Sequence, residues 1–253
     1  MKQTLKLPVE LDAPEKQHIG IGIFYGFVAF FALPYFVYFL MADLQDPYLL
    51  TWFELGYHVI NFGIAFGLFR EYLMDGLFTF RLQLKEFLFS IKLALLIIAA
   101  LVAIVYVAAS LCGVSWLFST LMAVFPVSEM EVLFFGGELV FYNPLLSFIC
   151  AVVLSPLSIT CLFYCVSFVP AFRVRPWLGY LAVAVWIGFT HINNAVTSLD
   201  VFTEIGVFIP QLPIHIIACW SFRRTNNVWT PMVTLAFANL LAWAYLFVLF
   251  LAH

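Results

Sequence analysis

The sequence predicts an all-α protein, a polytopic bundle of about seven transmembrane helices with its N-terminus on the cytoplasmic side. Composition is the first observation behind this prediction. Of the 253 residues, 65% are hydrophobic and 10% are charged, whereas a soluble domain is about 45–50% apolar and about 25% charged. The second observation is the order of the residues. Long apolar runs follow one another, and basic residues occupy every other connection between them.

Each predicted span is an apolar run close to the length of about 20 residues that crosses a hydrocarbon core. The spans cover residues 19–41, 51–69, 88–112, 143–170, 176–198, 206–222 and 229–251. The fourth is the longest. Pro156 is expected to kink it and to free a backbone carbonyl, which then needs a partner inside the protein.

The charges provide a test of this division. All 11 Lys and Arg residues fall on one side of the membrane: before the first span, between the second and third, and after the fourth and sixth. The acidic pairs Asp43 with Asp46 and Asp200 with Glu204 fall on the other side. By the positive-inside rule the N-terminus is cytoplasmic and His253 is outside. A count wrong by one span would break the alternation, but a missed pair of spans would not.

Four regions follow from this division of the chain. They are a cytoplasmic tail (1–18), N-terminal transmembrane helices (19–112), an extracytoplasmic or re-entrant segment (113–142) and a C-terminal transmembrane core (143–253). Each apolar half of 113–142 is short for a span, so the count rises to eight or nine only if this segment re-enters the membrane. The stretch GLFTFRLQLKEFLFSIK, residues 76–92, is either an amphipathic helix on the cytoplasmic surface or an extension of the third span.

Polar side chains inside the spans are the candidates for a functional site, because they are costly against lipid and turn toward the bundle interior. They are Ser155, Ser158, Thr160 and Tyr164 near Pro156, then Thr190, His191, Asn193 and Asn194, and Asn239 in the last span. His58 and His215 stand apart from these groups. The alternative is that such residues only join helices through hydrogen bonds, worth about 0.6–2 kcal/mol each.

Several classes of membrane protein do not fit. A retinal pigment needs a lysine for its Schiff base, and no lysine follows Lys92. A voltage sensor needs a row of arginines within a span, and none is present. The five cysteines lie in apolar stretches without a C-x-x-C pair, so we expect buried thiols and neither a metal nor a cofactor. The expected environment is a lipid bilayer, with no nucleic acid as partner.

Three stretches carry a family resemblance. SPLSITCLFYC contains Pro156 and Phe163, IGFTH ends at His191, and RRTNNVWTPMVTLAFANLLA contains Asn239. In order and internal spacing they resemble the motifs of the CPBP family (CAAX protease and bacteriocin-processing, or Abi), which are intramembrane glutamic-type proteases. Those motifs are Pro-x-x-Glu-Glu-x-x-Phe-Arg-Gly, Phe-x-x-x-His, and a basic turn followed by Trp, Pro and His-x-x-x-Asn. The resemblance covers roughly residues 145–245.

The departures from these motifs remove the family's chemistry. The resemblance implies remnant catalytic positions at Ile159 and Thr160 (the paired glutamates), Tyr164 (the arginine), His191, Leu235 (the third-motif histidine) and Asn239. Of the polar residues that the family uses, only His191 and Asn239 remain. Peptide hydrolysis needs a base and a group that stabilises the oxyanion, and neither isoleucine nor threonine can act as that base. The sequence therefore predicts a catalytically inactive member.

Such a member is expected to act as a scaffold, regulator or chaperone of a membrane or cell-envelope protein. The partner, a single-span or polytopic membrane protein, would lie in the former substrate cavity. We expect a partner-binding polar cluster of Thr160, Tyr164, His191, Asn194 and Asn239, in which His191 is neutral and hydrogen-bonded. The resemblance implies a prokaryotic plasma membrane.

Two alternatives remain from the sequence. One is an active protease in which Glu138 or Glu204 supplies the carboxylate, although both are predicted near the outer surface. The other is a small transporter, which would be favoured by inverted repeats with paired broken helices. The sequence shows one broken span and no convincing repeat.

Overall fold

The computed structural model describes residues 16–33, 47–80, 83–112, 143–198 and 201–252. These residues form helices joined by short turns and contain no strand, which confirms the all-α prediction. The elements are α1 (Lys16–Phe27), the π-helix η1 (Val28–Ala32), α3 (Pro47–Phe80), α4 (Leu84–Cys112), α8 (Pro144–Phe148), η3 (Ile149–Leu154), α9 (Ser155–Phe163), η4 (Tyr164–Phe168), α10 (Val169–Val174), α11 (Pro176–Ser198), α12 (Val201–Thr225) and α13 (Trp229–Ala252). Segment 113–142, whose path the sequence leaves open, lies outside the described residues.

Every predicted span overlaps a helix. α11 has the predicted bounds, and α4 ends at the predicted residue, Cys112. α3 is longer than predicted, but its backbone departs from helical geometry at Phe69 (φ −118°, ψ 20°), where the second span was predicted to end. Among the described residues, the continuous run Pro144–Val174 is the one helix that is long and apolar enough to cross a membrane by length and composition.

Residues 76–92 do not form a single helix: 76–80 end α3 and 84–92 begin α4, so only the second part of the stretch extends the helix of the predicted third span. α3 continues to Phe80, and α4 starts at Leu84 and runs without a break through the predicted span. Tertiary contacts hold the start of α4 in place. Gln83 donates its Nε2–H to the carbonyl of Thr225 at 2.6 Å, and Glu86 pairs with Arg224 at the end of α12.

Prolines mark where several helices begin. Pro47, Pro144 and Pro176 are the first residues of α3, α8 and α11. Proline suits this position because its missing N–H would have no partner there, and its fixed φ is already helical. At α8 the start is also capped, since the side chain of Asn143 accepts a hydrogen bond from the amide of Leu146 at 3.2 Å.

Prolines also explain the three π-helices. In the sequence each π-helix is followed by one residue and then a proline, namely Pro34, Pro156 and Pro170. The residue between them donates its amide to a carbonyl five positions back: Leu33 to Val28, Ser155 to Cys150, and Val169 to Tyr164. A proline ring clashes with the carbonyl four residues before it, and a wider π-turn relieves that clash. The predicted disturbance at Pro156 therefore takes the form of a π-helix.

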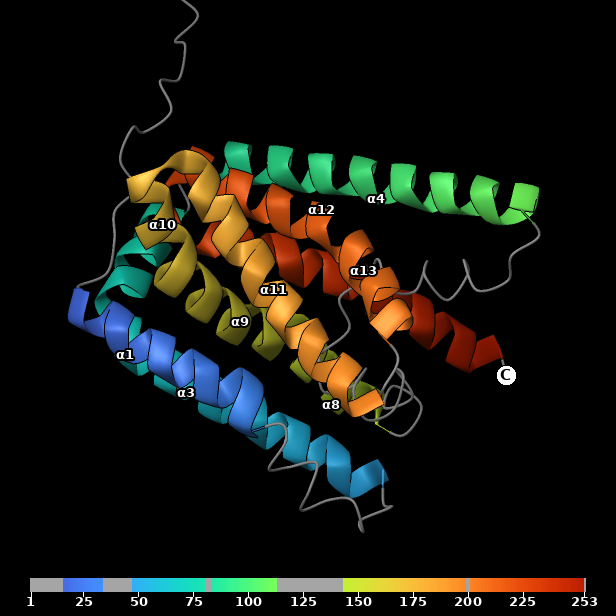
Figure 1. Ribbon diagram of the computed structural model, residues 1–253, viewed down its shortest axis with the longest axis horizontal. Helices are drawn as coiled ribbons and strands as arrows, with labels where there is room; N and C mark the ends of the chain where they lie inside the picture. The colour runs from blue at the N-terminus through green and yellow to red at the C-terminus, as the bar shows by residue number, and fades with distance from the viewer. Residues whose placement is uncertain (1–15, 34–46, 81–82, 113–142, 199–200, 253) are drawn as a thin grey trace, which may run out of the picture.

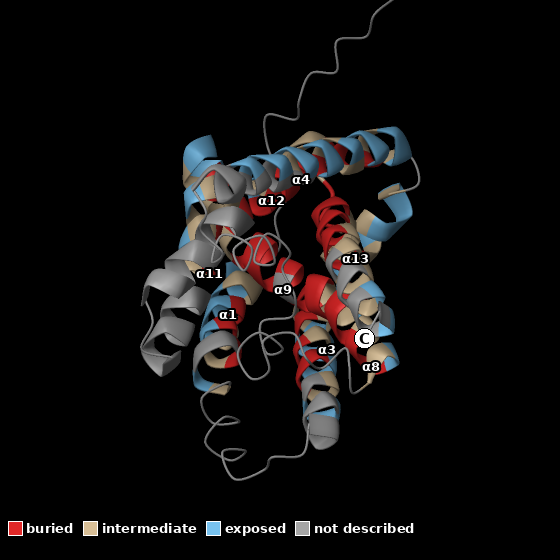
Figure 2. Cartoon of the chain, turned by 90° about the vertical axis from the view of Figure 1, so that its right-hand side faces the viewer, coloured by how far each residue is buried: buried red, intermediate tan, exposed pale blue. Residues whose placement is uncertain are grey.

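The run from α8 to α10 forms the centre of the bundle (Figure 1). It packs against α3, α11 and α13, while α12 packs against α11, α13 and α4. Buried residues are concentrated on α9 and on the inward faces of the surrounding helices, whereas much of α4 is exposed (Figure 2). The largest fully buried side chains include Tyr164, Phe168 and Phe222. Outward faces carry exposed apolar side chains such as Phe24 and Leu96.

Basic helix ends gather at one end of the bundle, on the left in Figure 1. There α1 begins, α3 ends, α4 begins, α10 ends, and α12 turns into α13. The basic residues at these helix ends are Lys16, Lys85, Arg173, Arg175, Arg223 and Arg224. We call this the basic end. In the topology predicted from the sequence, this end faces the cytoplasm.

Candidate functional site

The candidate site begins with a backbone carbonyl that Pro156 frees. Within η3, the carbonyl of Ala151 would normally accept the amide of Ser155, but that amide bonds to Cys150 instead. The next residue is Pro156, which has no N–H. The side chain of Asn239, from α13, donates its Nδ2–H to Ala151 at 2.7 Å. The predicted free carbonyl is therefore confirmed, and its partner is a side chain inside the protein.

The same arrangement occurs a second time, near the N-terminus. The carbonyl of Ala29 in η1 loses its normal donor because the amide of Leu33 bonds to Val28, and Pro34 follows in the sequence. The hydroxyl of Tyr57, from α3, donates to Ala29 at 3.0 Å. At both places a π-turn before a proline leaves one carbonyl without a backbone donor. A polar side chain from a helix distant in the sequence donates a hydrogen bond to that carbonyl.

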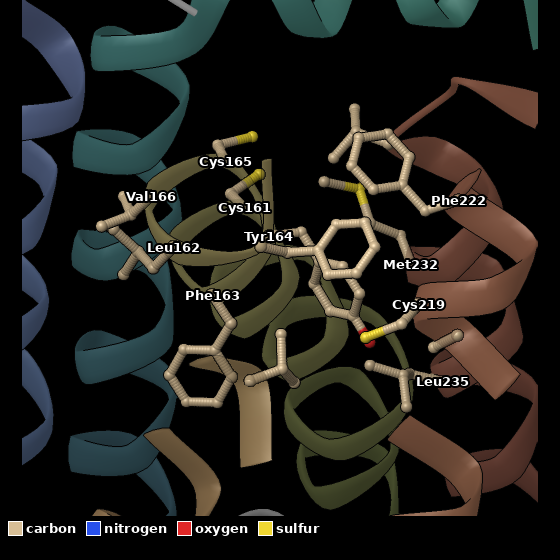
Figure 3. Packing of buried hydrophobic residues seen from close by; sticks show 14 of the residues in the cluster. Cys161, Leu162, Phe163, Tyr164, Cys165, Val166, Cys219, Phe222, Met232 and Leu235 are labelled. Atoms are coloured by element: carbon tan, nitrogen blue, oxygen red, sulfur yellow. The ribbon is translucent and has the colours of Figure 1, made fainter. Parts of the chain in front are cut away.

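Tyr164, which the resemblance aligns with an arginine, is an aromatic core residue. Tyr164 is fully buried, and Phe222, Cys219, Met232 and Leu235 surround it on the side of α12 and α13 (Figure 3). Its hydroxyl donates a long hydrogen bond to the carbonyl of His215 at 3.4 Å. Its ring packs edge-on against Phe222, with the centroids 6.2 Å apart. Two remnant positions, Tyr164 and Leu235, thus meet in an apolar environment.

The remaining members of the predicted cluster are only partly described. Thr160 is buried, with a hydroxyl that has no hydrogen-bond partner among the described residues, and the same holds for Oδ1 of Asn239. His191 and Asn194 lie on α11, but their side chains, and that of Ile159, lie outside the described set. No hydrogen bond among the described atoms joins two members of the cluster.

A second polar group, between α1 and α3, was missed from the sequence. Tyr25 donates its hydroxyl to Oδ1 of Asn61, which is fully buried. His58 is 2% exposed, and its ring meets the ring of Tyr57 edge-on with the centroids 5.2 Å apart. The sequence carried a signal, because Tyr57 and Asn61 are four residues apart and therefore share a helix face. Together with Tyr57 and Ala29, these residues link the two N-terminal helices.

The turn between α12 and α13 contains the most specific part of the family resemblance, RRTNNVWTP. Asn227 is 1% exposed and accepts the amide of Trp229 at 2.9 Å, an Asx-turn. Its Nδ2 donates to the carbonyl of Gly76 at 2.7 Å and to Oγ1 of Thr79 at 3.2 Å. The indole of Trp229 donates to the carbonyl of Leu73 at 2.7 Å. The motif therefore attaches this turn to α3.

This attachment gives a testable expectation. Asn227→Ala removes one acceptor and two donated hydrogen bonds in a buried place, and we expect it to lower the free energy of unfolding by about 2–3 kcal/mol. The measurement is thermal or denaturant unfolding of the purified protein in detergent. Asn226→Gly is the matched control, since residue 226 has a φ of 50°, which glycine adopts readily. Equal stability of the two variants would contradict the role of Asn227.

The described side chains around Tyr164, Leu235 and Asn239 supply hydrogen bonds and include no carboxylate. Among the described residues there is no group of three or more His, Cys, Asp and Glu side chains that would hold a metal ion. Glu138 lies outside the described residues, and Glu204 lies on α12 with a side chain that is not described. Comparison with known proteins found no matching family model, no matching curated protein and no matching solved structure.

Proposed function

We propose that the chain is a seven-span integral membrane protein, a CPBP-like fold without protease activity, which holds a membrane or cell-envelope partner. The observation that carries the proposal is the filling of the remnant site by packed, uncharged side chains. Tyr164 is fully buried against aromatic rings, and Leu235 is 3% exposed. An intramembrane glutamic protease needs a carboxylate at this place, and residues 143–253 contain only two, Asp200 and Glu204.

Three features support a membrane location with the N-terminus inside. The central run Pro144–Val174 is long and apolar enough to span a bilayer. Large apolar side chains are exposed over several helices, for example Phe24, Leu96 and Leu181, and in water such a surface would promote association. The basic residues at the helix ends gather at one end of the bundle.

The unsatisfied polar atoms support partner binding. A buried polar group without a hydrogen bond costs about 1–3 kcal/mol, and Thr160 and Asn239 each carry such an atom among the described residues. In the proposal, a partner segment supplies the missing hydrogen bonds, together with His191 and Asn194 of α11. Binding would then need neither a carboxylate nor a bond cleavage.

Site-specific photo-crosslinking tests this proposal. A photoreactive residue at position 191 or 194 is expected to trap one stoichiometric membrane protein in the native membrane. The same residue at Leu96, an outward position that is 67% exposed, is the control and is expected to trap lipid or nothing. A reporter peptide made from the trapped segment should stay intact with the purified protein.

Two results would overturn the proposal. Equal trapping from positions 191 and 96 would show that the interior does not hold the partner. Cleavage of the reporter that is lost in His191→Ala would instead assign protease activity to this chain, and loss in Glu138→Gln or Glu204→Gln would identify the carboxylate.

A further inference from the structure

A cavity of about 510 Å³ lies at the basic end, away from the remnant site. Its polar lining comes from α1, α3 and the turn between α12 and α13, and it includes His18, Arg70, Glu71, Asp75, Asn226 and Asn227. It follows the backbone irregularity at Phe69, after which α3 continues for about three turns. Its volume falls within the range of about 300–1,000 Å³ that is usual for small-molecule sites.

The cavity carries charges of both signs. Arg70, Glu71 and Asp75 are exposed, and within the described part of the chain none of them forms an ion pair or a side-chain hydrogen bond. Glu71 and Asp75 are one helical turn apart and lie on the same side of α3. A ligand that satisfies this lining needs a cationic group for the two carboxylates and an anionic group for Arg70.

Two features make the cavity a built site. Asn227 is 1% exposed and is held by its hydrogen bonds to Gly76 and Trp229, so this wall is fixed. Gly67 also lines the cavity and leaves space there, because a Cβ added to it would meet no atom within 4 Å. The residue at position 67 therefore controls how much of the cavity is open.

The chemistry of the lining selects the ligand. We propose that this cavity binds the headgroup of an ethanolamine phospholipid, with the phosphate at Arg70 and the primary ammonium at Glu71 and Asp75. Arginine suits phosphate because its guanidinium donates two parallel hydrogen bonds. A primary ammonium can donate three hydrogen bonds, whereas a choline group can donate none. A glycerol headgroup has no cationic group, so the carboxylates of Glu71 and Asp75 would lie near a phosphate of the same charge without a partner.

The assignment to a lipid rests on the membrane location in the proposed function. With the basic end at the cytoplasmic face, the cavity lies at the depth of the headgroups of the inner leaflet. The same ammonium–phosphate chemistry occurs in soluble glycerophosphoethanolamine. The experiment must therefore separate a lipid source from a soluble one.

Native mass spectrometry of the full-length protein in detergent tests the inference. Ethanolamine, choline and glycerol phospholipids with identical acyl chains are added at equal concentration. We expect the ethanolamine lipid to be retained about tenfold more than the others, which corresponds to about 1.4 kcal/mol. Gly67→Leu should abolish this preference by filling the cavity. Gly63→Leu is the matched control, because an added Cβ at Gly63 also meets nothing within 4 Å and Gly63 does not line the cavity.

The charge variants sharpen the result. The double change Glu71→Gln with Asp75→Asn should remove the preference over the glycerol lipid, and Arg70→Gln should weaken all phosphate binding at this place. Equal retention of the three lipids, or equal effects of Gly67→Leu and Gly63→Leu, would overturn the inference. Equal binding of soluble glycerophosphoethanolamine would overturn the lipid source. Partner crosslinking at position 191 should be unaffected in Gly67→Leu, so failure here is distinguishable from failure of the proposed function.

Discussion

Placing an arginine at position 164, the residue of the CPBP motif that this position resembles, is expected to unfold the protein. Tyr164 is fully buried between α9 and α12, against Phe168 and Phe222. An arginine there would bury a charge without a partner, which costs about 3–5 kcal/mol or more when compensating groups are absent. We expect Tyr164→Arg to lose most of its yield of folded protein and to melt well below the parent. The measurement is thermal unfolding in detergent, followed by size-exclusion chromatography.

Tyr164→Phe is the matched control. It keeps the ring and loses only the hydroxyl, whose hydrogen bond to His215 is long, at 3.4 Å. We expect a loss of about 0.5–1.5 kcal/mol, the usual net value of one hydrogen bond. If Tyr164→Arg were as stable as Tyr164→Phe, residue 164 would face a hydrated cavity, and the packed remnant site that carries the proposed function would be wrong.

The second large effect concerns the carbonyl that Pro156 frees. Asn239→Leu keeps the side-chain size but leaves the carbonyl of Ala151 buried without its donor. We expect the free energy of unfolding to fall by about 1–3 kcal/mol. In a Pro156→Ala background the same change should cost less, because residue 156 then has an amide that the carbonyl of Ala151 accepts within the π-turn. A double-mutant cycle measured by unfolding in detergent gives the coupling directly.

Pro170→Ala serves as the control background for this cycle. Pro170 also follows a π-helix, but the carbonyl that Asn239 contacts belongs to Ala151, near Pro156. Asn239→Leu should therefore cost the same in the parent protein and in the Pro170→Ala background. A coupling of similar size with both prolines would mean that Asn239 stabilises the whole central run and does not act on one freed carbonyl.

Sequence reasoning predicted the parts of this fold that depend on local chemistry. Hydrophobic runs predict where the helices lie, because a segment in an apolar environment must satisfy its backbone hydrogen bonds within itself and present apolar side chains to its surroundings. The bounds of α11 and the end of α4 follow in this way. The freed carbonyl at Pro156 was also predictable, because a proline removes its own amide wherever the helix lies.

The predicted site is described only in part, because the side chains of His191 and Asn194 lie outside the described set. Thr160, Tyr164, Leu235 and Asn239 were identified from the family motifs, and all four are buried in the core. Among the described residues, Asn239 bonds to Ala151 and Tyr164 bonds to the carbonyl of His215, and the expected bonds to His191 and Asn194 stay a prediction. Such partners depend on the rotation and height of one helix against another. Spacing along a single helix does not contain that information.

The sequence by itself thus determined the helical class and the helix positions. Tertiary structure alone decided which side chain donates a hydrogen bond to each freed carbonyl. Asn239 donates to Ala151, and Tyr57 donates to Ala29. It also decided that Asn227, in the turn between α12 and α13, donates a hydrogen bond to Gly76 of α3. The charged cavity lined by Gly67 likewise depends on the tertiary structure. These contacts join residues far apart in the chain. Their geometry is set by the packing of whole helices, and no local pattern encodes it.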